Sequence, residues 1–323
     1  MGQRIPVTGG AGYVGSQACK LFAAAGYEPV TFDNLSTGFD SQVKWGPLVV
    51  GDLHDTPRIE QTLVRIRPVA VVHFAAHAYV GESTQLPLKY YRNNVSGTVS
   101  LLTAMAAADV RTLVFSSTCA TYGIPATSTL AESHPQAPVN PYGRTKLMIE
   151  SILSDLDHSN QIRFVALRYF NAAGADPDGE IGERHDPETH LIPLAIRAAL
   201  GGAVLKVFGT DFPTPDGTAV RDYVHVWDLA MAHLAALEHL LGGGRSEFIN
   251  LGIGRGYSVR NIVETLGSLG LTVPTIDAPR RAGDPAILVA DAAKARAVLK
   301  WKPRYDRLDE LLRTAVAWHR ANG

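Results

Sequence analysis

Short apolar runs alternate with stretches of helical periodicity along the first half of the chain. Apolar residues recur at helical spacing over residues 14–22, and further helices are expected over 86–107 and after Pro141. The apolar runs that have the length of buried strands lie at residues 5–7, 29–32, 48–50, 69–74, 112–115 and 164–167. This alternation predicts an α/β fold, a doubly wound parallel sheet with helices on both faces.

The alternation of strand-like and helix-like segments becomes irregular after about residue 171. Gly, Pro, Asp and Glu crowd residues 171–188 and 209–217, which are expected to be long loops. A chain of 323 residues is long enough for two domains. We expect a first domain over residues 1–171, with 226–250 packing back onto it, and a smaller C-terminal α/β lobe over residues 172–323.

The predicted strands end on small or polar residues at Asp33, Asp52, Phe74 and Thr118. In open α/β sheets the ligand crevice lies at these carboxyl ends, so we expect the site there. Pro6 does not fit a central strand, because proline cannot donate to the ladder. A local defect is expected at that position.

Composition excludes several classes of protein. The chain is 46% hydrophobic and 19% charged, with a formal net charge of −1, which argues against a nucleic-acid partner. Cys19 and Cys119 form no disulfide framework and show no metal-ligand spacing, so no metal is expected. There is no apolar run of the ~18 residues that a membrane span needs, and no signal peptide is expected. These features predict a cytoplasmic protein with no membrane partner.

A glycine-rich turn follows the first predicted strand. Residues 8–15 read Thr-Gly-Gly-Ala-Gly-Tyr-Val-Gly, which contains both G-x-G-x-x-G and G-x-x-G-x-x-G. Glycines let the backbone turn tightly against a pyrophosphate, and the following helix start offers N–H groups to that anion. Asp33 ends the second strand, where a carboxylate accepts both ribose hydroxyls and repels a 2′-phosphate. The pattern predicts a Rossmann-type domain that binds NAD rather than NADP.

Tyr142 and Lys146 are four residues apart, so they share one face of the helix expected after Pro141. A lysine ammonium near a phenol favours the phenolate and lowers the pKa of the phenol. A tyrosine tuned in this way takes a proton from a sugar hydroxyl near neutral pH. Thr118 is the hydroxyl assigned to the site from its place at a strand end, with Ser117 as its competitor.

The motifs resemble those of the extended short-chain dehydrogenase/reductase family and, within it, its branch of UDP-galactose 4-epimerases. The resemblance covers nearly the whole chain, through residues 8–16, 32–38, 51–52, 73–83, 90–98, 115–123, 141–150, 167–174, 207–230, 250–254 and 279–285. It implies a reversible epimerisation at C4 of a UDP-hexose through a 4-keto intermediate. Tyr142 would be the base, Lys146 would hold it as phenolate, and Thr118 would bond the reacting oxygen.

The resemblance also implies two sets of binding residues. Those expected to line NAD are Gly9, Gly12, Tyr13, Val14, Gly15, Asp33, Asn34, Asp52, Leu53, Phe74, Ala75, Ala76, Asn93, Tyr142, Lys146 and Tyr169. Those expected to hold the UDP-sugar are Thr118, Asn171, His190, Leu191, Phe208, Arg221, Arg281, Asp284 and Leu288. Arginine suits a diphosphate because its planar fork matches phosphate geometry.

Four positions depart from the pattern of the family. Thr118 stands where better-known relatives have serine, and Ala78, after His77, stands where many have lysine. His190 replaces an asparagine, which puts a contact to uridine in doubt. Leu288 aligns with the residue beside the sugar ring, so the fit of an N-acetyl group stays open.

Other activities remain as alternatives at this point. Epimerisation of UDP-xylose and UDP-arabinose, or of UDP-N-acetylglucosamine, needs the same catalytic groups. A sugar-nucleotide dehydratase is disfavoured, because Cys119 and Ala120 occupy the positions of its Asp-Glu pair. A non-catalytic NAD sensor would not need Tyr142 and Lys146 in register.

The resemblance further implies a homodimer built from the helices after Gln85 and after Pro141. Apolar residues that support such a four-helix bundle are Leu101, Leu102, Met105, Leu147 and Met148.

Overall fold

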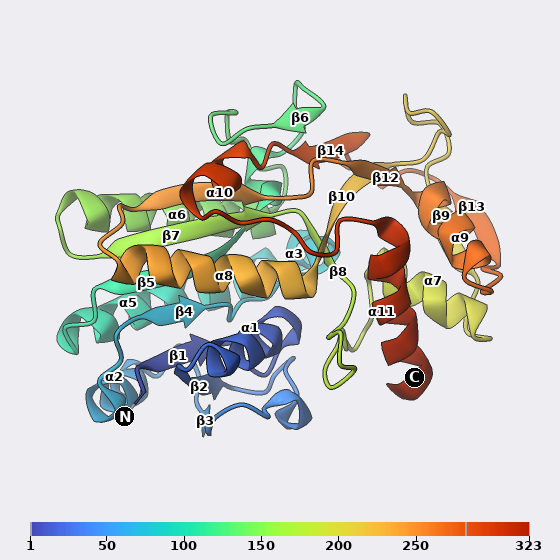
Figure 1. Cartoon of the computed structure of the whole chain (residues 1–323). Helices are drawn as coiled ribbons and strands as arrows, with labels where there is room; N and C mark the ends of the chain where they lie inside the picture. Colours follow the sequence, from blue (N-terminus) through green and yellow to red (C-terminus); the bar gives the residue numbers. More distant parts are fainter. Residues whose placement is uncertain (1, 282, 323) are drawn as a thin grey trace.

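A seven-stranded parallel sheet forms the larger part of the molecule (Figure 1). The computed structural model describes residues 2–281 and 283–322. The strand order is β11-β7-β5-β4-β1-β2-β3, in which every neighbouring pair is parallel. The strands are β1 (Arg4–Thr8), β2 (Glu28–Asp33), β3 (Leu48–Val50), β4 (Val71–His73), β5 (Thr112–Thr118), β7 (Arg163–Tyr169) and β11 (Glu247–Leu251). The predicted doubly wound α/β sheet is confirmed.

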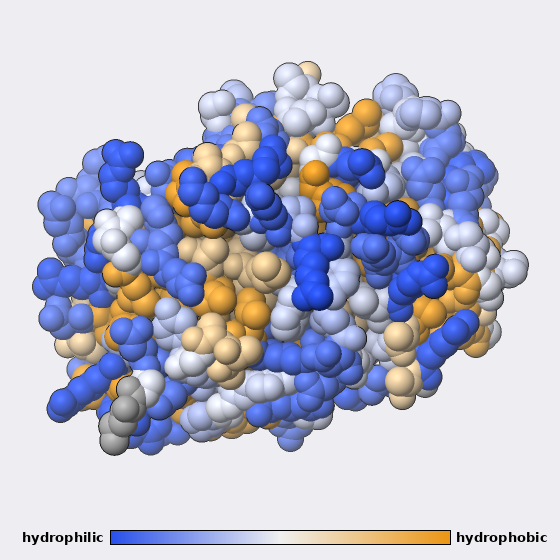
Figure 2. Space-filling model, viewed as in Figure 1, coloured by the Kyte–Doolittle hydropathy of each residue, from blue (hydrophilic) through white to orange (hydrophobic). Residues whose placement is uncertain are grey.

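Helices cover both faces of this sheet, and each face has its own apolar core. On one face α1 (Tyr13–Ala24) packs against α8 (Val226–Leu241), and both lie in front of the sheet in Figure 1. On the other face lie α2 (Thr56–Ile66), α5 (Gly97–Ala107) and α6 (Pro141–His158). Figure 2 shows a hydrophobic patch on the face that carries α8, within a surface that is mainly hydrophilic.

Pro6 lies inside β1 without disturbing its pairing with β2, since Pro6 pairs with Val30 in an unbroken register. The carbonyl groups of Arg4 and Thr8 accept hydrogen bonds from the β4 side, from Val69 and Phe74. The N–H and C=O groups of every second residue point to the same side of a strand, so the position of the missing N–H of Pro6 faces β4, as the carbonyl groups of Arg4 and Thr8 do. The β1–β4 ladder accordingly contains only Val7 and Thr8, so the expected defect falls on this one side.

The predicted helix over 86–107 is present but is not a uniform α-helix. It follows α3 (Val80–Gln85) and consists of α4 (Pro87–Tyr90), the π-helical segment η2 (Tyr91–Ser96) and α5. The sequence analysis missed the π segment, because a single widened turn does not change the apolar periodicity. Such widened turns are frequent at functional sites.

A second, smaller layer lies beyond the carboxyl end of the large sheet. Its central strand β10 (Val220–His225) pairs with β8 (Asn171–Ala173), β12 (Gly256–Ser258) and β14 (Ile287–Ala290), and β14 pairs with β6 (Thr129–Leu130). A two-stranded sheet joins β9 (Leu205–Phe208) to β13 (Thr275–Ala278). The helices of this lobe are α7 (Leu191–Ala199), α9 (Val259–Ser268) and α11 (Leu308–Asn322), which share one apolar core. Short helices lie at η1 (Asp40–Gln42), η3 (Cys119–Tyr122) and α10 (Ala293–Val298).

The chain passes between the two layers several times. α8 and β11 lie with the large sheet. Residues 292–301 also enter that core through Ala295, Leu299 and Trp301, which the sequence analysis had assigned to the C-terminal lobe. The indole of Trp301 donates to the main-chain oxygen of Asp228 in α8 at 2.8 Å.

Three residues predicted for a dimer interface face inward instead. Leu101, Leu102 and Met105 are buried in the core between the large sheet and α5. Met148 is 44% exposed, and Val99 on α5, which was not predicted, is 43% exposed. Within residues 2–281 and 283–322, none of the helices has the length and apolar character required to cross a bilayer.

Candidate active site

The glycine turn after β1 is built by close backbone contacts. Gly9 has a φ of +74°, and a Cβ there would lie 2.6 Å from the main-chain nitrogen of Ala75. A Cβ on Gly15 would lie 2.2 Å from the carbonyl oxygen of Gly9. Gly12 is the N-cap residue of α1, and no side chain hydrogen-bonds the free N–H groups at this helix end. The first turn of α1, which begins with Tyr13 and Val14, contains no acidic residue. The helix start therefore keeps its N–H groups and its positive dipole end available to an anion.

Asp33 closes this turn from the end of β2. Its carboxylate accepts from the main-chain N–H of Ala11 at 3.1 Å and of Leu35 at 2.8 Å, which fixes its orientation. Burial raises the pKa of Asp33 from its ordinary value. Asn34 donates to Asp52 at 2.8 Å, so two predicted cofactor residues are in contact.

The loop after β4 is tied to the helices by Asn94, a residue that the sequence analysis did not single out. Asn94 is fully buried in the π segment, and its amide oxygen accepts from the main-chain N–H of His77 at 2.9 Å. Its NH₂ group donates to the carbonyl oxygen of His77 at 3.0 Å and to the Thr145 hydroxyl at 3.1 Å. The predicted residue Asn93 donates to the Asn94 amide oxygen at 3.0 Å. Asn94 thus connects η2, the β4 loop and α6.

The remaining predicted cofactor residues on the sheet are placed by its strands. Leu53 is a core residue that packs against Gly97. Phe74 and Ala75 both donate their main-chain N–H groups to Thr8, which sets the β4 loop against the glycine turn, and Ala76 continues that loop.

The three hydroxyls at the end of β5 have different partners. Ser116 hydrogen-bonds the phenol of Tyr169 on β7. Ser117 is fully buried and donates to Glu150 at 2.5 Å. The Thr118 side chain lies close enough to the phenol of Tyr142 to oppose the rise in the pKa of that phenol. Of the two competing hydroxyls, Thr118 is the one that faces Tyr142.

Tyr142 and Lys146 both lie on α6, with the N-cap Asn140 accepting from the main-chain N–H of Gly143 at 2.8 Å. Burial raises the pKa of Tyr142 well above its ordinary value, and the neighbouring Tyr169 adds to the rise. Burial lowers the pKa of Lys146 to about 7, which Glu150 partly opposes. The ammonium of Lys146 donates to the carbonyl oxygen of Ser116 at 2.7 Å. Burial is the largest cause of the shift for both groups, and the lowering of the phenol pKa by Lys146 stays a prediction for the protein with bound cofactor.

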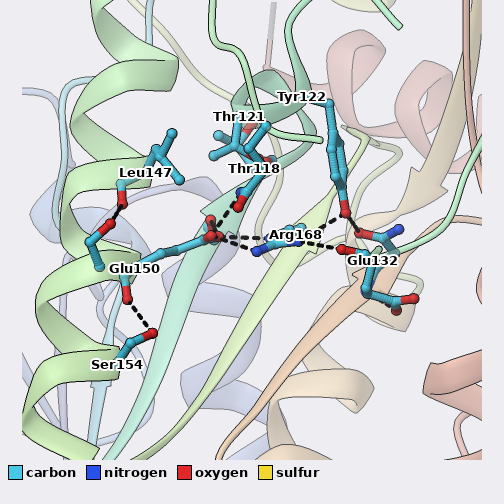
Figure 3. A network of polar contacts seen from close by, with 12 residues as sticks. Thr118, Thr121, Tyr122, Glu132, Leu147, Glu150, Ser154 and Arg168 are labelled. Atoms are coloured by element: carbon cyan, nitrogen blue, oxygen red, sulfur yellow. Dashed lines mark hydrogen bonds and ion pairs between the residues drawn. The ribbon is translucent and has the colours of Figure 1, made fainter. Parts of the chain in front are cut away.

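Behind this face, Glu150 and Arg168 form a buried network (Figure 3). Arg168 also donates to the Tyr122 hydroxyl at 3.1 Å, and Tyr122 donates to Asn250 at 2.7 Å. The sequence carries two signals for this network that were not used. Glu150 continues the spacing of Tyr142 and Lys146 by four more residues, and Arg168 is a charge that directly follows the apolar run of residues 164–167.

The C-terminal lobe brings some of the predicted substrate residues together. Arg221 on β10 forms an ion pair with Asp284 and stands opposite Leu288 in the β10–β14 register. Leu288 packs against the cluster that contains Cys119, the residue after Thr118. Phe208 and Arg281 form a separate pair, with the guanidinium 4.0 Å from the ring centroid. Asn171 on β8 donates to the carbonyl oxygen of Asp222 at 3.2 Å.

His190 is the N-cap residue of α7, directly before Leu191, and its Nδ1 hydrogen-bonds the Glu183 carboxylate. Two nearby histidines lower the pKa of Glu183 to about 2 despite its burial. Glu183 and Glu188 raise the pKa of His185 to about 9. His190 therefore belongs to an acidic and histidine-rich loop that the sequence analysis did not identify.

Comparison with known proteins gives consistent results over the whole chain. A model of the NAD dependent epimerase/dehydratase family matches residues 5–252. The chain is 52% identical over 322 residues to a UDP-glucose 4-epimerase of Rhizobium leguminosarum bv. trifolii, covering 98% of each chain. The UDP-glucose 4-epimerase structure from Brucella ovis, in complex with NAD, has a TM-score of 0.95 at 53% identity and covers 97% of each chain. That from Bifidobacterium longum, in complex with NAD+ and UDP, has a TM-score of 0.93 at 34% identity and covers 99% of each chain. The chain therefore belongs to the NAD dependent epimerase/dehydratase family.

Proposed function

We propose that this protein is an NAD-dependent UDP-glucose 4-epimerase, which interconverts UDP-glucose and UDP-galactose. The observation that carries the proposal is the placement of Thr118 near the Tyr142 phenol, with the buried Lys146 one helical turn further along α6. It occurs in a chain that shares 52% identity with a protein named UDP-glucose 4-epimerase.

NAD fits the residues at the carboxyl end of the large sheet. A Cβ on Gly9 or Gly15 would clash with the backbone of the turn, so glycine is required for the tight turn of a pyrophosphate-binding site. The uncapped start of α1 supplies N–H groups for the diphosphate, and the Asp33 carboxylate supplies acceptors for a ribose. Asn34, Asp52 and the loop after β4 would continue this binding surface.

When bound, NAD would supply an acceptor for the hydride of sugar C4 and, once reduced, a hydride donor for the opposite face of the 4-keto ring. Tyr142 removes the proton of the C4 hydroxyl as that hydride leaves, and gives the proton back on return. Thr118 holds the reacting oxygen, because its side chain already lies against the phenol. Lys146 provides a donor beside the phenol and the cofactor ribose. Lys146 is buried and Tyr142 is partly buried, which limits the access of water that would otherwise compete for the proton.

Residues of the C-terminal lobe hold the UDP part of the substrate. Arg221 and Arg281 are the two guanidinium groups available for the diphosphate, with Asp284 and Phe208 orienting them. Asn171, His190 and Leu191 would contact the nucleoside. The first unit, residues 1–171 with 226–250, would carry NAD, and residues 172–323 would carry most substrate contacts.

The protein is a cytoplasmic homodimer in this proposal. The exposed apolar side chains of Val99 on α5 and Met148 on α6 support a helix-mediated contact between two copies. Light scattering at micromolar concentration measures the mass directly, and a monomer mass would refute the dimer.

Two measurements test the activity and the cofactor. Purified protein should convert UDP-galactose to UDP-glucose without added NAD, and its denatured supernatant should contain NAD or NADH. Activity that depends on added NADP, or no turnover of UDP-galactose by protein that holds NAD, would contradict the proposal.

A further inference from the structure

Four side chains that can bind a metal converge in the loop before α7. They come from one short segment, in which Glu183, His185, Glu188 and His190 each offer one ligand atom. These atoms all lie within 4.8 Å of one another. The two glutamates are interior groups, with only 4% and 1% of their side chains exposed.

Three distances within this group are close to the edge of a small tetrahedron. His185 Nδ1 lies 3.3 Å from Glu183 Oε1 and 3.6 Å from Glu188 Oε1, and His190 Nδ1 lies 3.8 Å from Glu188 Oε1. Zinc bonds to nitrogen and oxygen of about 2.0–2.2 Å place neighbouring tetrahedral ligands roughly 3.4 Å apart. The hydrogen bond between His190 and Glu183 is the edge that would have to lengthen.

Two buried polar atoms of the group have no hydrogen-bond partner among the described residues. They are Nδ1 of His185 and Oε2 of Glu188. Glu188 Oε1 already accepts from the main-chain N–H groups of Thr189 at 2.8 Å and His190 at 2.9 Å, which fixes the carboxylate. A buried polar atom without a hydrogen bond is costly, and His185 Nδ1 has only ion-pair contacts with the two carboxylates, so both atoms can take a further ligand.

A neighbouring acidic cluster in the same loop provides a contrast. Asp176, Asp178 and Glu180 also lie close together, but Lys20 from α1 places its ammonium among them. Lys20 lies 2.8 Å from Asp176, 2.7 Å from Asp178 and 2.6 Å from Glu180. That cluster already holds a cation of the chain, whereas no lysine or arginine contact is found for Glu183 or Glu188 among the described ion pairs.

We propose that Glu183, His185, Glu188 and His190 bind one zinc ion. Two imidazole nitrogens and two carboxylate oxygens form a set that favours zinc over magnesium or calcium, which prefer oxygen ligands alone. The earlier expectation of no metal considered only cysteine spacing. The spacing E-x-H-x-x-E-x-H at residues 183–190 was the unused signal.

The surroundings of the site indicate a structural role for the ion. The rings of Tyr13 and Tyr79 stand edge-on to His185, at centroid distances of 6.3 and 5.8 Å. The indole of Trp318 on α11 donates to the main-chain oxygen of Glu183 at 3.1 Å. Zinc would thus fix the loop before α7 between the glycine turn and α11. The inference does not depend on the reaction, since metal content is measured without an activity assay.

The test measures metal content in protein that carries no affinity tag, because tag histidines bind zinc. Protein stripped with EDTA is equilibrated with ZnCl₂, freed of excess metal by gel filtration and analysed by mass spectrometry for metals. One zinc per chain is expected, and CoCl₂ should give the visible absorption bands of tetrahedral Co²⁺. Addition of MgCl₂ should not displace the ion.

Two variants and one control locate the ion. Glu188→Gln and His185→Gln keep the size of each side chain or nearly so, and each should weaken zinc binding more than ~10-fold. Asp178→Asn in the neighbouring cluster should retain one zinc per chain. Circular dichroism of the metal-free variants checks that they are folded.

Three results would overturn the proposal. Unaltered protein that binds no zinc would show that the histidines and glutamates pair only with one another. Folded Glu188→Gln and His185→Gln proteins that both retain full zinc would place the ion elsewhere. Loss of zinc from Asp178→Asn alone would assign it to the neighbouring acidic cluster.

Discussion

Arg168 and Glu150 form a two-point ion pair in the interior, with Nε 2.9 Å from Oε1 and Nη2 2.7 Å from Oε2. Their side chains are only 4% and 2% exposed. Glu150 also accepts from Ser117, so the pair joins α6 to β5 and β7 (Figure 3). A buried pair of this kind fixes geometry, because either charge alone would be left without compensation.

Glu150→Ala should lower the free energy of unfolding by ~3–5 kcal/mol, because it leaves the Arg168 charge buried and unpaired. Urea unfolding of the purified variant measures the change. Combining Glu150→Ala with Arg168→Leu should cost less than the sum of the two single changes. The exposed Arg111, paired with Asp109 at the surface, is a matched control, and Arg111→Ala should unfold like the unaltered protein. Additive losses would show that the two residues are not coupled.

Tyr142→Phe should reduce kcat by ~10²- to 10⁴-fold, the range for loss of a general base. The fold and the bound cofactor should be retained, because the ring still fills the same space. Steady-state assay with UDP-galactose, with the cofactor content determined on the same sample, measures both quantities. A loss of less than tenfold would mean that another group removes the proton.

The two neighbouring hydroxyls should separate into a catalytic and a structural role. Thr118→Ala should lower kcat by about 10²-fold, since it removes a hydrogen-bond donor from the reacting oxygen. Ser117→Ala should mainly lower the unfolding free energy, because Ser117 serves the buried Glu150. Each variant is the control for the other. A large kcat loss in Ser117→Ala with unchanged stability would reverse the assignment.

Leu288→Ser should increase activity on UDP-N-acetylglucosamine relative to UDP-glucose. Leu288 stands opposite Arg221 and packs near Cys119, so a smaller side chain there would open space beside the sugar ring. Relief of one clash of methyl size is worth ~1–3 kcal/mol, so the gain should be about 10- to 200-fold at most. The ratio of kcat/KM for the two substrates is the measurement. An unchanged ratio would mean that the N-acetyl group lies elsewhere.

Acid should destabilise the protein through histidines that are buried in the neutral form. Burial lowers the pKa of His73 and of His225 to about 3, and that of His233 to about 4. Between these folded-state pKa values and the ordinary histidine pKa of 6.5, the folded state binds fewer protons than the unfolded chain. The contribution of these histidines to the free energy of unfolding is therefore complete above pH 6.5 and decreases as the pH falls below it. Each histidine should cost about 1.4 kcal/mol per pH unit in that window.

Urea unfolding at pH 7.5, 6.0 and 5.0 follows this loss. In His233→Gln, the free energy of unfolding should fall less steeply with decreasing pH, by the contribution of one histidine. His233 is suited to the comparison because its Nε2 is buried and has no partner among the described residues. Equal slopes in the two proteins would show that His233 does not titrate on unfolding.

The sequence by itself determined the features that depend on local spacing. Strand and helix periods gave the α/β order, the glycines of residues 8–15 marked the turn that only residues without a Cβ can form, and the four-residue spacing put Tyr142 and Lys146 on one helix face. These properties follow from the geometry of one element and its neighbours in the sequence, so they can be predicted without knowing the order of the strands in the sheet.

Only the tertiary structure decided which side chains meet across elements. Thr118 lies near Tyr142 while Ser117 donates to Glu150, although both partners lie on α6, because the two hydroxyls meet different turns of that helix. Asn94 reaches His77 and Thr145 from a π-helical turn that leaves the apolar pattern unchanged. Leu101 and Met105 face the core rather than a partner, since periodicity shows that a face is apolar and not what covers it. Partners in space depend on strand order and chain return, and this information is absent from local spacing.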